Sequence, residues 1–228
     1  MHISALTAGR LFFETYAPHL GSATVVDIGA QDINGSLKEH CPPNLKYIGV
    51  DYVPGKGVDV VLQDPYSLPF KDSSIDVVVS SSCFEHSALF WVLFLEILRI
   101  LKPDGLFYLN VPSNGYWHRH PVDCWRFYPD SGNALVTWAR RNGFDALLLE
   151  SFIGKQGTEQ WNDFVAVFLK DRSRASIYPD RMLASKTDFT NGMTDQQAEV
   201  LNPQAVPEDG MKLAIISDLI SGRIAVKS

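Results

Sequence analysis

Two apolar segments near the start of the chain each end beside an acidic residue and a glycine. The first covers residues 25–29 and reads V-V-D-I-G, and the second covers residues 47–51 and reads Y-I-G-V-D. In an open parallel sheet, a glycine turn after the first strand lets the backbone approach a nucleotide, and an acid at the end of the second strand binds the ribose hydroxyls. Asp51 follows Gly29 at about the 20-residue spacing that such a pair needs. The pattern therefore predicts an α/β fold with a nucleoside pocket at one edge of its sheet.

The residue two positions after Gly29 argues against a dinucleotide ligand. A pyrophosphate site of the G-x-G-x-x-G type has glycine there, but this chain has Gln31, whose side chain would crowd a phosphate. A nucleoside without phosphate tolerates this residue better, and S-adenosylmethionine is such a ligand. For the glycine turn taken alone, a buried strand and turn with no ligand is the alternative.

Six segments, in the same order along the chain, resemble motifs of the class I S-adenosylmethionine-dependent methyltransferases, closest to the type 11 group. They are V-V-D-I-G at 25–29, G-V-D at 49–51, Q-D-P-Y-S-L-P-F at 63–70, S-I-D-V-V-V-S at 74–80, E-H at 85–86 and L-R-I-L-K-P-D-G at 98–105. The resemblance covers roughly the first half of the chain. The chain departs from the family pattern at Gln31 and Asp104, where the family has glycine.

The resemblance implies S-adenosylmethionine as the cofactor and a cofactor site made from residues of the first four segments and the residues next to them. These are Asp27, Ile28, Gly29, Ala30, Gln31, Asp51, Tyr52, Asp64, Pro65 and Ser81. In the family, the acid that corresponds to Asp64 faces the adenine amino group. Asp51 is the strongest single candidate, because its alternative role as a helix cap or turn residue does not explain the surrounding motifs.

Apolar stretches that alternate with helical patterns predict a Rossmann-like, doubly wound parallel sheet. We expect strands near residues 24–28, 46–51, 58–62, 75–80, 105–111, 145–152 and 163–169, and helices near 3–17, 34–40, 85–101 and 130–142. The resemblance implies that this seven-stranded sheet is mostly parallel, with the last strand antiparallel. The helix at 85–101 is apolar on most faces, so it is either buried between the sheet and its neighbours or forms the face of a homodimer.

The pattern changes after residue 170. We expect a methyltransferase domain over 1–170, with an N-terminal helix within 1–20, and a C-terminal extension over 171–228 that serves as a lid, an arm or an oligomer contact. The extension is polar and contains several prolines, with a short helix starting near Thr194 and another over 211–224.

Composition limits the class of protein. The net charge of −6 argues against a nucleic-acid partner, which usually meets a basic face. The three cysteines form no C-x-x-C motif and indicate free thiols in a reducing compartment. The chain start lacks the pattern of a signal peptide, and no apolar stretch reaches the length of about 18 residues that a membrane span needs. We therefore expect a cytoplasmic protein without a membrane or nucleic-acid partner.

The segment at 111–128 is the best candidate for the acceptor side. It follows a predicted strand and so lies at the ligand-binding edge of the sheet, and it holds two histidines, two arginines and five aromatic residues. Methyl transfer from a sulfonium needs an aligned acceptor and often a base that removes its proton. We rank His118 first as that base, with Asp123 orienting it, followed by His120 and His86. A structural hydrogen bond is the alternative for each histidine.

Trp117 and Arg126 are the candidate substrate-binding residues. Arg126 could bind a carboxylate or phosphate through its planar guanidinium, or form a salt bridge to Asp123 or Asp130. His118, His120 and Asp123 suit a divalent ion by residue type, but their spacing on an irregular loop constrains geometry weakly, so we expect no metal.

The sequence thus predicts an enzyme that transfers a methyl group from S-adenosylmethionine to a small-molecule acceptor, such as a hydroxyl of a sugar or natural product. A non-catalytic S-adenosylmethionine or nucleoside-binding module and a protein methyltransferase are the alternatives. The acidic charge disfavours an RNA acceptor, and the missing glycine at Gln31 disfavours a nicotinamide-dependent oxidoreductase.

Overall fold

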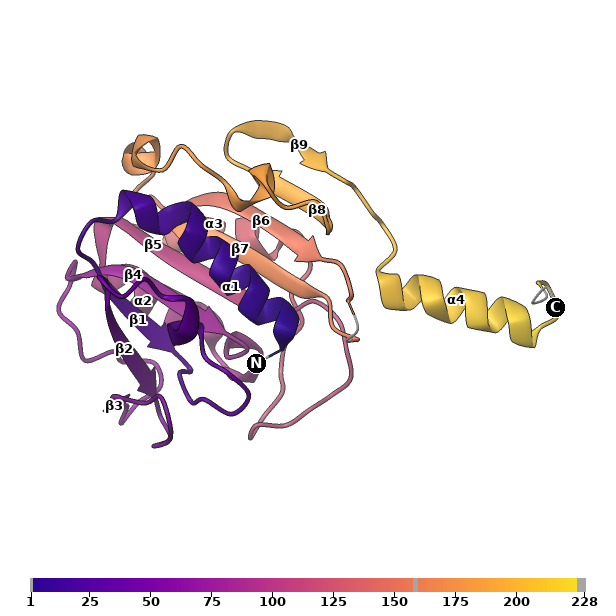
Figure 1. Cartoon of the computed structure of the whole chain (residues 1–228), viewed down its shortest axis with the longest axis horizontal. Coiled ribbons are helices and arrows are strands. Elements are labelled where there is room, and N and C mark those ends of the chain that lie inside the picture. The colour runs from indigo at the N-terminus through magenta and orange to yellow at the C-terminus, as the bar shows by residue number, and fades with distance from the viewer. Residues whose placement is uncertain (1, 158–159, 225–228) are drawn as a thin grey trace.

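A computed structural model describes residues 2–157 and 160–224 of the chain. Within this part, one mixed sheet of nine strands has the order β3-β2-β1-β4-β5-β7-β6-β8-β9 (Figure 1). The strands are β1 (Thr24–Ile28), β2 (Lys46–Asp51), β3 (Val60–Val61), β4 (Ile75–Ser81), β5 (Leu101–Pro112), β6 (Leu147–Gly154), β7 (Asp163–Leu169), β8 (Phe189–Thr194) and β9 (Gln197–Leu201).

The first seven strands confirm the predicted doubly wound sheet. β1 to β5 pair in parallel, and β7 runs antiparallel to both β5 and β6, as the family resemblance implied. β5 starts four residues earlier than predicted, because Leu101 already pairs with Ile75 before a register shift. The sheet also continues beyond residue 170, where β8 adds to β6 and β9 adds to β8, both antiparallel.

The helices are α1 (Ile3–Tyr16), α2 (Phe90–Ile100), α3 (Ser131–Arg141) and α4 (Glu208–Ile220), with 3-10 turns η1 (Ala17–His19), η2 (Leu37–His40), η3 (Phe84–His86), η4 (Arg172–Ile177) and η5 (Met182–Ala184). The prediction of a helix at 34–40 is wrong. Only η2 forms there, because Ser36 caps Lys38 at 3.2 Å and the prolines after Cys41 stop propagation.

The predicted helix near Thr194 is also wrong. That residue ends β8, and β9 begins three residues later, so the segment forms a hairpin on the edge of β6. Most side chains of β9 are exposed, the β8–β9 ladder is irregular, and Asn191 adopts a φ of 51°. The expected tail helix is α4, which starts at Glu208 and ends at Ile220.

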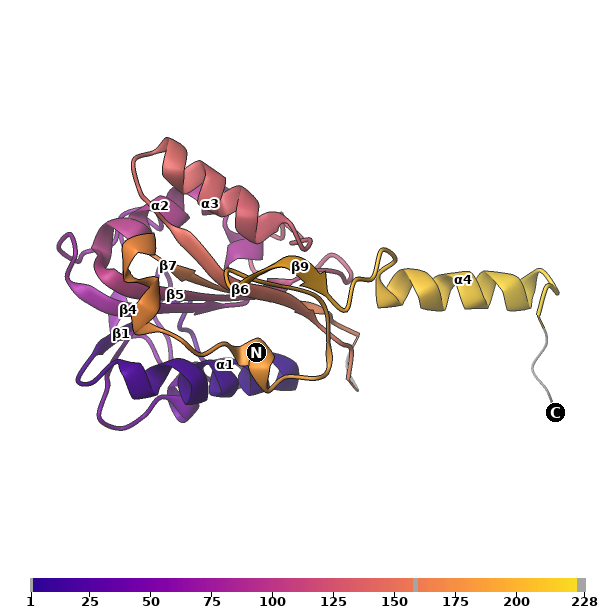
Figure 2. The same ribbon diagram turned by 90° about the horizontal axis from the view of Figure 1, so that it is seen from above.

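Helices cover the two faces of the sheet unequally. α1 lies on one face, and α2 and α3 lie on the other (Figure 2). Phe12, Phe13 and Tyr16 of α1 pack into one core cluster, and Phe94 and Leu98 of α2 pack into the other. The inner face of α2 is buried, which confirms the buried-helix interpretation for that face.

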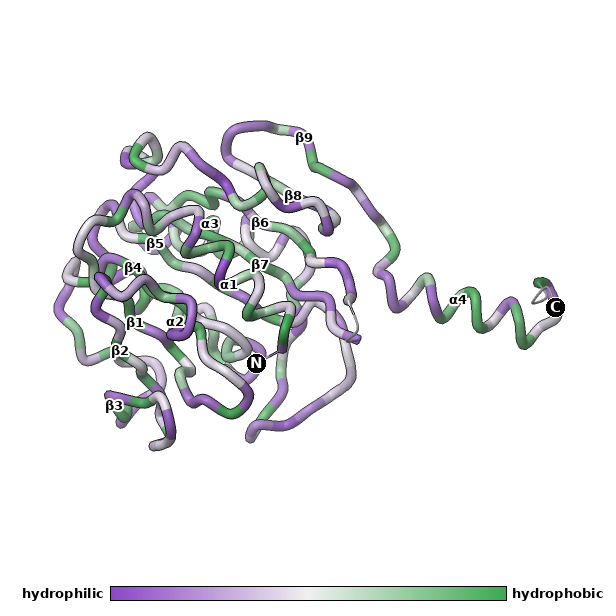
Figure 3. Tube along the Cα trace, viewed as in Figure 1, coloured by the Kyte–Doolittle hydropathy of each residue, from purple (hydrophilic) through white to green (hydrophobic). Residues whose placement is uncertain are grey.

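α4 extends away from the sheet, and apolar and polar residues alternate along it (Figures 1 and 3). None of its residues is buried, and Leu213 and Ile220 are 66% and 83% exposed. Its first turn is anchored, because Glu208 accepts hydrogen bonds from the Gln156 amide at 2.7 Å and from Asn162 at 2.6 Å. No helix among the described residues is long and apolar enough to cross a membrane.

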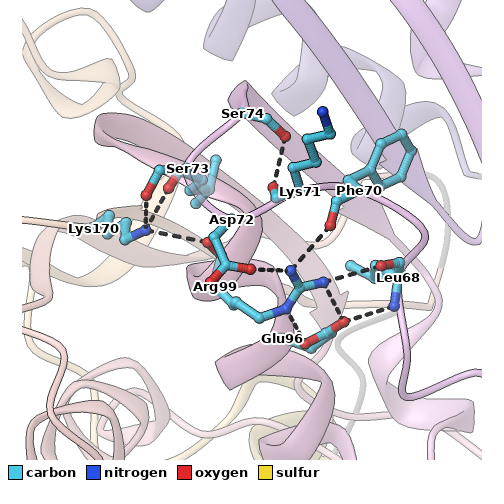
Figure 4. Close-up of polar contacts among 10 residues, drawn as sticks. Leu68, Phe70, Lys71, Asp72, Ser73, Ser74, Glu96, Arg99 and Lys170 are labelled. Atoms are coloured by element: carbon cyan, nitrogen blue, oxygen red, sulfur yellow. Dashed lines mark hydrogen bonds and ion pairs between the residues drawn. The ribbon is translucent and has the colours of Figure 1, made fainter.

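Arg99, near the end of α2, holds the segment that leads into β4 (Figure 4). Its guanidinium donates to both carboxylate oxygens of Glu96 at 2.7 Å, to the carbonyls of Leu68 and Phe70 at 3.0 Å, and to Asp72 at 2.5 Å. The arginine of the 98–105 motif therefore fixes the loop that carries the 63–70 motif.

Candidate functional site

The turn after β1 can form only with glycine at position 29. Gly29 has a φ of 84°, and a Cβ there would lie 2.7 Å from Cβ of Cys83. The Gly29 and Ala30 amides donate to the Val50 carbonyl at 2.9 and 3.2 Å, which ties the turn to the end of β2. Cys83 was not among the predicted site residues, because its contact with the turn is made across 54 residues of sequence.

Asp51 lies directly beside this turn, as predicted. One carboxylate oxygen accepts from the Gln31 amide at 3.2 Å, and the other accepts from the Val53 amide at 3.1 Å. A carboxylate offers about four lone-pair positions, so two backbone bonds leave acceptor capacity for ligand hydroxyls. Asp51 is partly exposed and can meet a ligand.

The loop after β2 packs over the glycine turn. Its Gly57 carbonyl lies so close to Gly49 that a side chain at Gly49 would clash with it. Lys56 forms a 2.6 Å salt bridge with Asp32, and its carbonyl accepts from the Asp32 amide at 2.8 Å. The Gln31 side chain packs against Gly55 of this loop. Gln31 therefore contacts a neighbouring loop through its side chain and Asp51 through its amide.

Asp27 is buried inside the sheet and serves a structural contact. It is 3% exposed and accepts a 2.6 Å hydrogen bond from the Tyr47 hydroxyl. Burial raises the pKa of Asp27 to about 7, although the bond from Tyr47 opposes the shift. The side chains of Ile28 and Ala30 are also buried. A ligand at this edge of the sheet would therefore meet mainly the backbone of these residues.

Of the other predicted cofactor residues, Tyr52, Asp64 and Pro65 are exposed on loops after β2 and β3. The carboxylate of Asp64 accepts from the Tyr66 amide at 2.9 Å. Leu62, two residues earlier, donates its amide to the Asp51 carbonyl at 2.8 Å. The start of this loop is therefore joined to the Asp51 strand end.

Unpartnered polar atoms gather at and just beyond the carboxyl ends of β4 and β5. Among the described residues, Ser81 Oγ, Glu85 Oε2 and Asn110 Oδ1 are buried without a hydrogen-bond partner. Buried polar groups are normally paired, so these atoms fit a polar ligand at this edge. Glu85 and Asn110 were not predicted as site residues, although Asn110 stands out as a polar residue in an apolar strand.

Asp123 and Arg126 organise the segment at 111–128, called the acceptor loop after its predicted role. The guanidinium donates to the two carboxylate oxygens at 2.6 and 2.9 Å, so the salt-bridge alternative for Arg126 is formed with Asp123. Hydrogen bonding from Arg126 lowers the pKa of Asp123 to about 2. Asp123 also accepts from the His118 amide at 2.6 Å, and its carboxylate lies 3.4 Å from His118 Nδ1. The predicted pair of His118 and Asp123 is therefore brought together.

Three predicted histidines converge, although one comes from η3 and two come from the loop. The ring centroid of His86 lies 5.1 Å from that of His118 and 6.2 Å from that of His120. His86 Nδ1 lies 2.5 Å from the Val122 carbonyl, and burial lowers the pKa of His86. The structure thus groups all the candidate bases at one place.

Trp117 lies outside this cluster, with 71% of its surface exposed and Arg119 over its ring. Trp161 takes the position beside the histidines instead. Its ring centroid lies 5.0 Å from that of His118, and the Arg126 guanidinium lies over its ring. No sequence signal marked Trp161, because it lies 43 residues from His118 between β6 and β7.

A cavity of about 450 Å³ opens between α2, α3 and the acceptor loop. Aromatic side chains dominate its lining, and Arg126 adds a charged group. The aromatic residues are Phe90, Trp91, Trp125, Phe127 and Trp138. Trp125 and Arg126 belong both to this cavity and to the loop that holds the histidines. The arrangement can accommodate an apolar group near a cluster of imidazoles.

Comparisons with known proteins agree with this geometry. Residues 9–109 match the family model for a methyltransferase domain. The chain is 35% identical over 114 residues to an uncharacterized methyltransferase of Mycobacterium avium, which covers 45% of each protein. It is 31% identical over 119 residues to phthiotriol/phenolphthiotriol dimycocerosates methyltransferase 1 of Mycobacterium ulcerans, covering 50% of this chain and 38% of that protein. The chain therefore spans less than half the length of these curated relatives.

A solved structure supports the fold. The 1,6-didemethyltoxoflavin-N1-methyltransferase of Burkholderia thailandensis, bound to 1,6-didemethyltoxoflavin and S-adenosylhomocysteine, aligns with a TM-score of 0.55. The alignment covers 73% of this chain and 78% of that chain at 18% identity. Residues 9–109, which carry the glycine turn and Asp51, are therefore similar in sequence to a methyltransferase domain, and the sheet has the fold of a solved methyltransferase structure.

Proposed function

We propose that the protein binds S-adenosylmethionine and transfers its methyl group to a hydroxyl of a small-molecule acceptor with an apolar body. The observation that carries the proposal is the pairing of Gly29, held at a φ of 84°, with the Asp51 carboxylate on the next strand. The glycine removes a side chain from the approach to the sheet edge, and the carboxylate can accept from both ribose hydroxyls.

The cofactor supplies an activated methyl group on a sulfonium, so the protein contributes binding, alignment and proton removal. Backbone groups of residues 29–31 would hold the cofactor at the strand end. Asp64 would accept from the adenine amino group, as the family resemblance implies. Ser81 and Asn110, whose buried oxygens lack partners among the described residues, would bind polar atoms of the cofactor or acceptor.

Proton removal is assigned to His118. Its Nδ1 faces Asp123, which leaves Nε2 to take the proton of the acceptor hydroxyl while the oxygen attacks the methyl carbon. The electron pair of the breaking carbon–sulfur bond stays on sulfur, giving S-adenosylhomocysteine. Asp123 is held ionised by Arg126, so it can orient the imidazole and stabilise its charged form.

The acceptor class is inferred from the cavity beside this loop. A lining of five aromatic side chains favours an apolar body over a bare sugar. The M. ulcerans relative is named for a triol, which supports a hydroxyl as the methylated group. The absence of disulfides among the three cysteines supports a cytoplasmic location.

Calorimetry with S-adenosylmethionine and S-adenosylhomocysteine tests the proposal. Wild type should bind both, and Asp51→Ala should lose about 10- to 100-fold in affinity, because hydrogen bonds to a charged group contribute about 1.5–3 kcal/mol. Asp104→Ala removes the same charge from an exposed position near the start of β5 and should bind like wild type. Absence of binding by wild type, or equal binding by Asp51→Ala, would refute the cofactor site.

Turnover separates the enzyme from the non-catalytic alternative. S-adenosylhomocysteine should form with apolar alcohols as acceptors and should fall sharply in His118→Ala. Tight cofactor binding without product on small molecules, but with methylation of proteins, would favour the protein methyltransferase alternative. Binding without turnover on either class would favour a binding module.

A further inference from the structure

We propose that Glu85, His86 and His118 form a binding site for a divalent first-row transition-metal ion. Each residue offers one ligand atom, and these three atoms all lie within 4.8 Å of one another. By residue type the sequence offers His118, His120 and Asp123, for which we expect no metal. In the set proposed here, Asp123 is engaged by Arg126, and Glu85 and His86 replace Asp123 and His120. The binding of the ion is independent of the proposed methyl transfer, whereas its role toward an acceptor rests on that function.

Backbone contacts hold the two chain segments of this site together. Glu85 and His86 lie in η3, directly after β4, and His118 lies on the loop after β5. The Glu85 carbonyl accepts from the Cys124 amide at 2.7 Å and from the Trp125 amide at 3.3 Å. His86 Nδ1 also contacts the Val122 carbonyl. The loop is thus fixed over η3, so the ligand atoms are brought close before any ion arrives.

The carboxylate of Glu85 is an independent indication of a cation. Its residue is 1% exposed, and Oε2 has no hydrogen-bond partner among the described residues. Its other oxygen lies 3.7 Å from His86 Nε2. A buried carboxylate oxygen without a hydrogen-bond partner is costly in free energy. A bound cation would supply the missing counter-charge.

The two imidazoles are oriented as metal ligands usually are. A ligating histidine commonly directs its second ring nitrogen at a carbonyl or carboxylate, which fixes the tautomer. His86 Nδ1 faces the Val122 carbonyl, and His118 Nδ1 lies 3.4 Å from both the Asp123 carboxylate and the Tyr116 carbonyl. Nε2 of each ring is therefore the atom that can reach the ion.

The ligand types select the class of ion. Two imidazoles and one carboxylate suit Zn²⁺ and related transition-metal ions, whereas Mg²⁺ prefers oxygen ligands and retains its waters. Three protein ligands leave an open position that an acceptor oxygen can fill, and the ion would lower the pKa of that hydroxyl. When the ion is bound, His118 is one of its ligands and is not free to act as the base. His120, whose ring centroid lies 6.2 Å from that of His86, would then take the proton of the acceptor hydroxyl.

Metal titration of the chelator-treated full chain, without S-adenosylmethionine, tests the site. Wild type should bind one Zn²⁺ with saturation, excess Mg²⁺ should not compete, and Co²⁺ should give visible d–d absorption. His86→Ala, His118→Ala and Glu85→Gln should each weaken Zn²⁺ binding by at least about tenfold. His40→Ala, a histidine on η2 outside the cluster, is the matched control and should bind like wild type.

If Glu85→Gln unfolds because Glu85 is buried, His118→Ala on the partly exposed loop decides the test. Zn²⁺ affinity equal in wild type, His118→Ala and His86→Ala overturns the assignment, as does a wild type that binds no Zn²⁺. Calorimetry with S-adenosylmethionine on the same samples keeps the two proposals apart. A wild type that binds S-adenosylmethionine but no Zn²⁺ would refute the metal site alone. A wild type that binds Zn²⁺ but no S-adenosylmethionine would refute the methyltransferase proposal alone.

Discussion

Replacement of Glu150 by alanine should expose how strongly residues 171–201 are fixed to the sheet. Glu150 lies fully buried in β6 and accepts hydrogen bonds from the Tyr16 hydroxyl at 2.6 Å and from the Met182 and Leu183 amides at 2.7 and 3.0 Å. It therefore joins α1, β6 and η5 through one carboxylate. Glu150→Ala leaves three buried donors unpaired, each costing about 1–3 kcal/mol, while removal of the buried charge offsets part of that loss.

We expect Glu150→Ala to lower the free energy of unfolding by about 3–5 kcal/mol. Tyr16→Phe removes one donor and should cost about 1 kcal/mol. Glu150→Gln should fall between them, because its amide oxygen can accept but its NH2 group would face a backbone donor. Urea unfolding followed by circular dichroism measures all three. A loss in Glu150→Ala no larger than in Tyr16→Phe would refute the reasoning, since the η5 amides would then have other partners.

Three further changes probe the cofactor edge and the loop that approaches it. Gly29→Ala should lose about 2–5 kcal/mol of stability in urea unfolding, from backbone strain and the clash with Cys83. Gly143→Ala is the control, because Gly143 has a φ of 88° but no atom lies within 4 Å of a new Cβ, and it should lose only about 1–2 kcal/mol. Asp27 has a folded pKa of about 7, above its ordinary 3.8, so its contribution to stability is full below about pH 4 and is lost as the pH rises through 7. In wild type, the free energy of unfolding should therefore fall by at most about 4 kcal/mol between about pH 4 and pH 7 because of Asp27, and Asp27→Asn should remove this fall. The same pH profile in Asp27→Asn and wild type would contradict the raised pKa. Arg99→Lys should reduce the free energy of unfolding by about 2 kcal/mol and lower the melting temperature by several degrees, because one ammonium cannot reproduce the five hydrogen bonds of the guanidinium. A melting curve like that of wild type would show that other contacts hold the loop.

The sequence predicted the parts of the fold that local pattern determines. β1, β2 and β7 start and end where their apolar runs do, because burial on both faces of a sheet leaves few polar residues inside a strand. β8 and β9 were missed, since β8 pairs with β6 across about 40 residues, β9 pairs only with β8, and both strands have a weakly apolar pattern. The segment at 34–40 was predicted as a helix because its apolar pattern does not show that the Ser36 cap and the prolines after Cys41 limit it to the short η2.

The positions of the candidate site residues follow the same division. That Asp51 lies beside the turn at Gly29, and that His118 and Asp123 lie close together, could be predicted, because the carboxyl ends of parallel strands meet at one edge and the loops that follow them share that edge. Trp161 and the unpartnered oxygen of Glu85 could not, since both depend on how the β6–β7 connection and η3 meet the acceptor loop.

The two borders of the sheet bear on how the protein behaves at high concentration. One border is β3, only two residues long, and the other is β9, which is irregularly paired, exposed and carries Glu199. A long, flat and uncharged border strand is what recruits strands from other chains. Neither border offers one, so the fold can lengthen its sheet by two strands and still resist polymerisation along it.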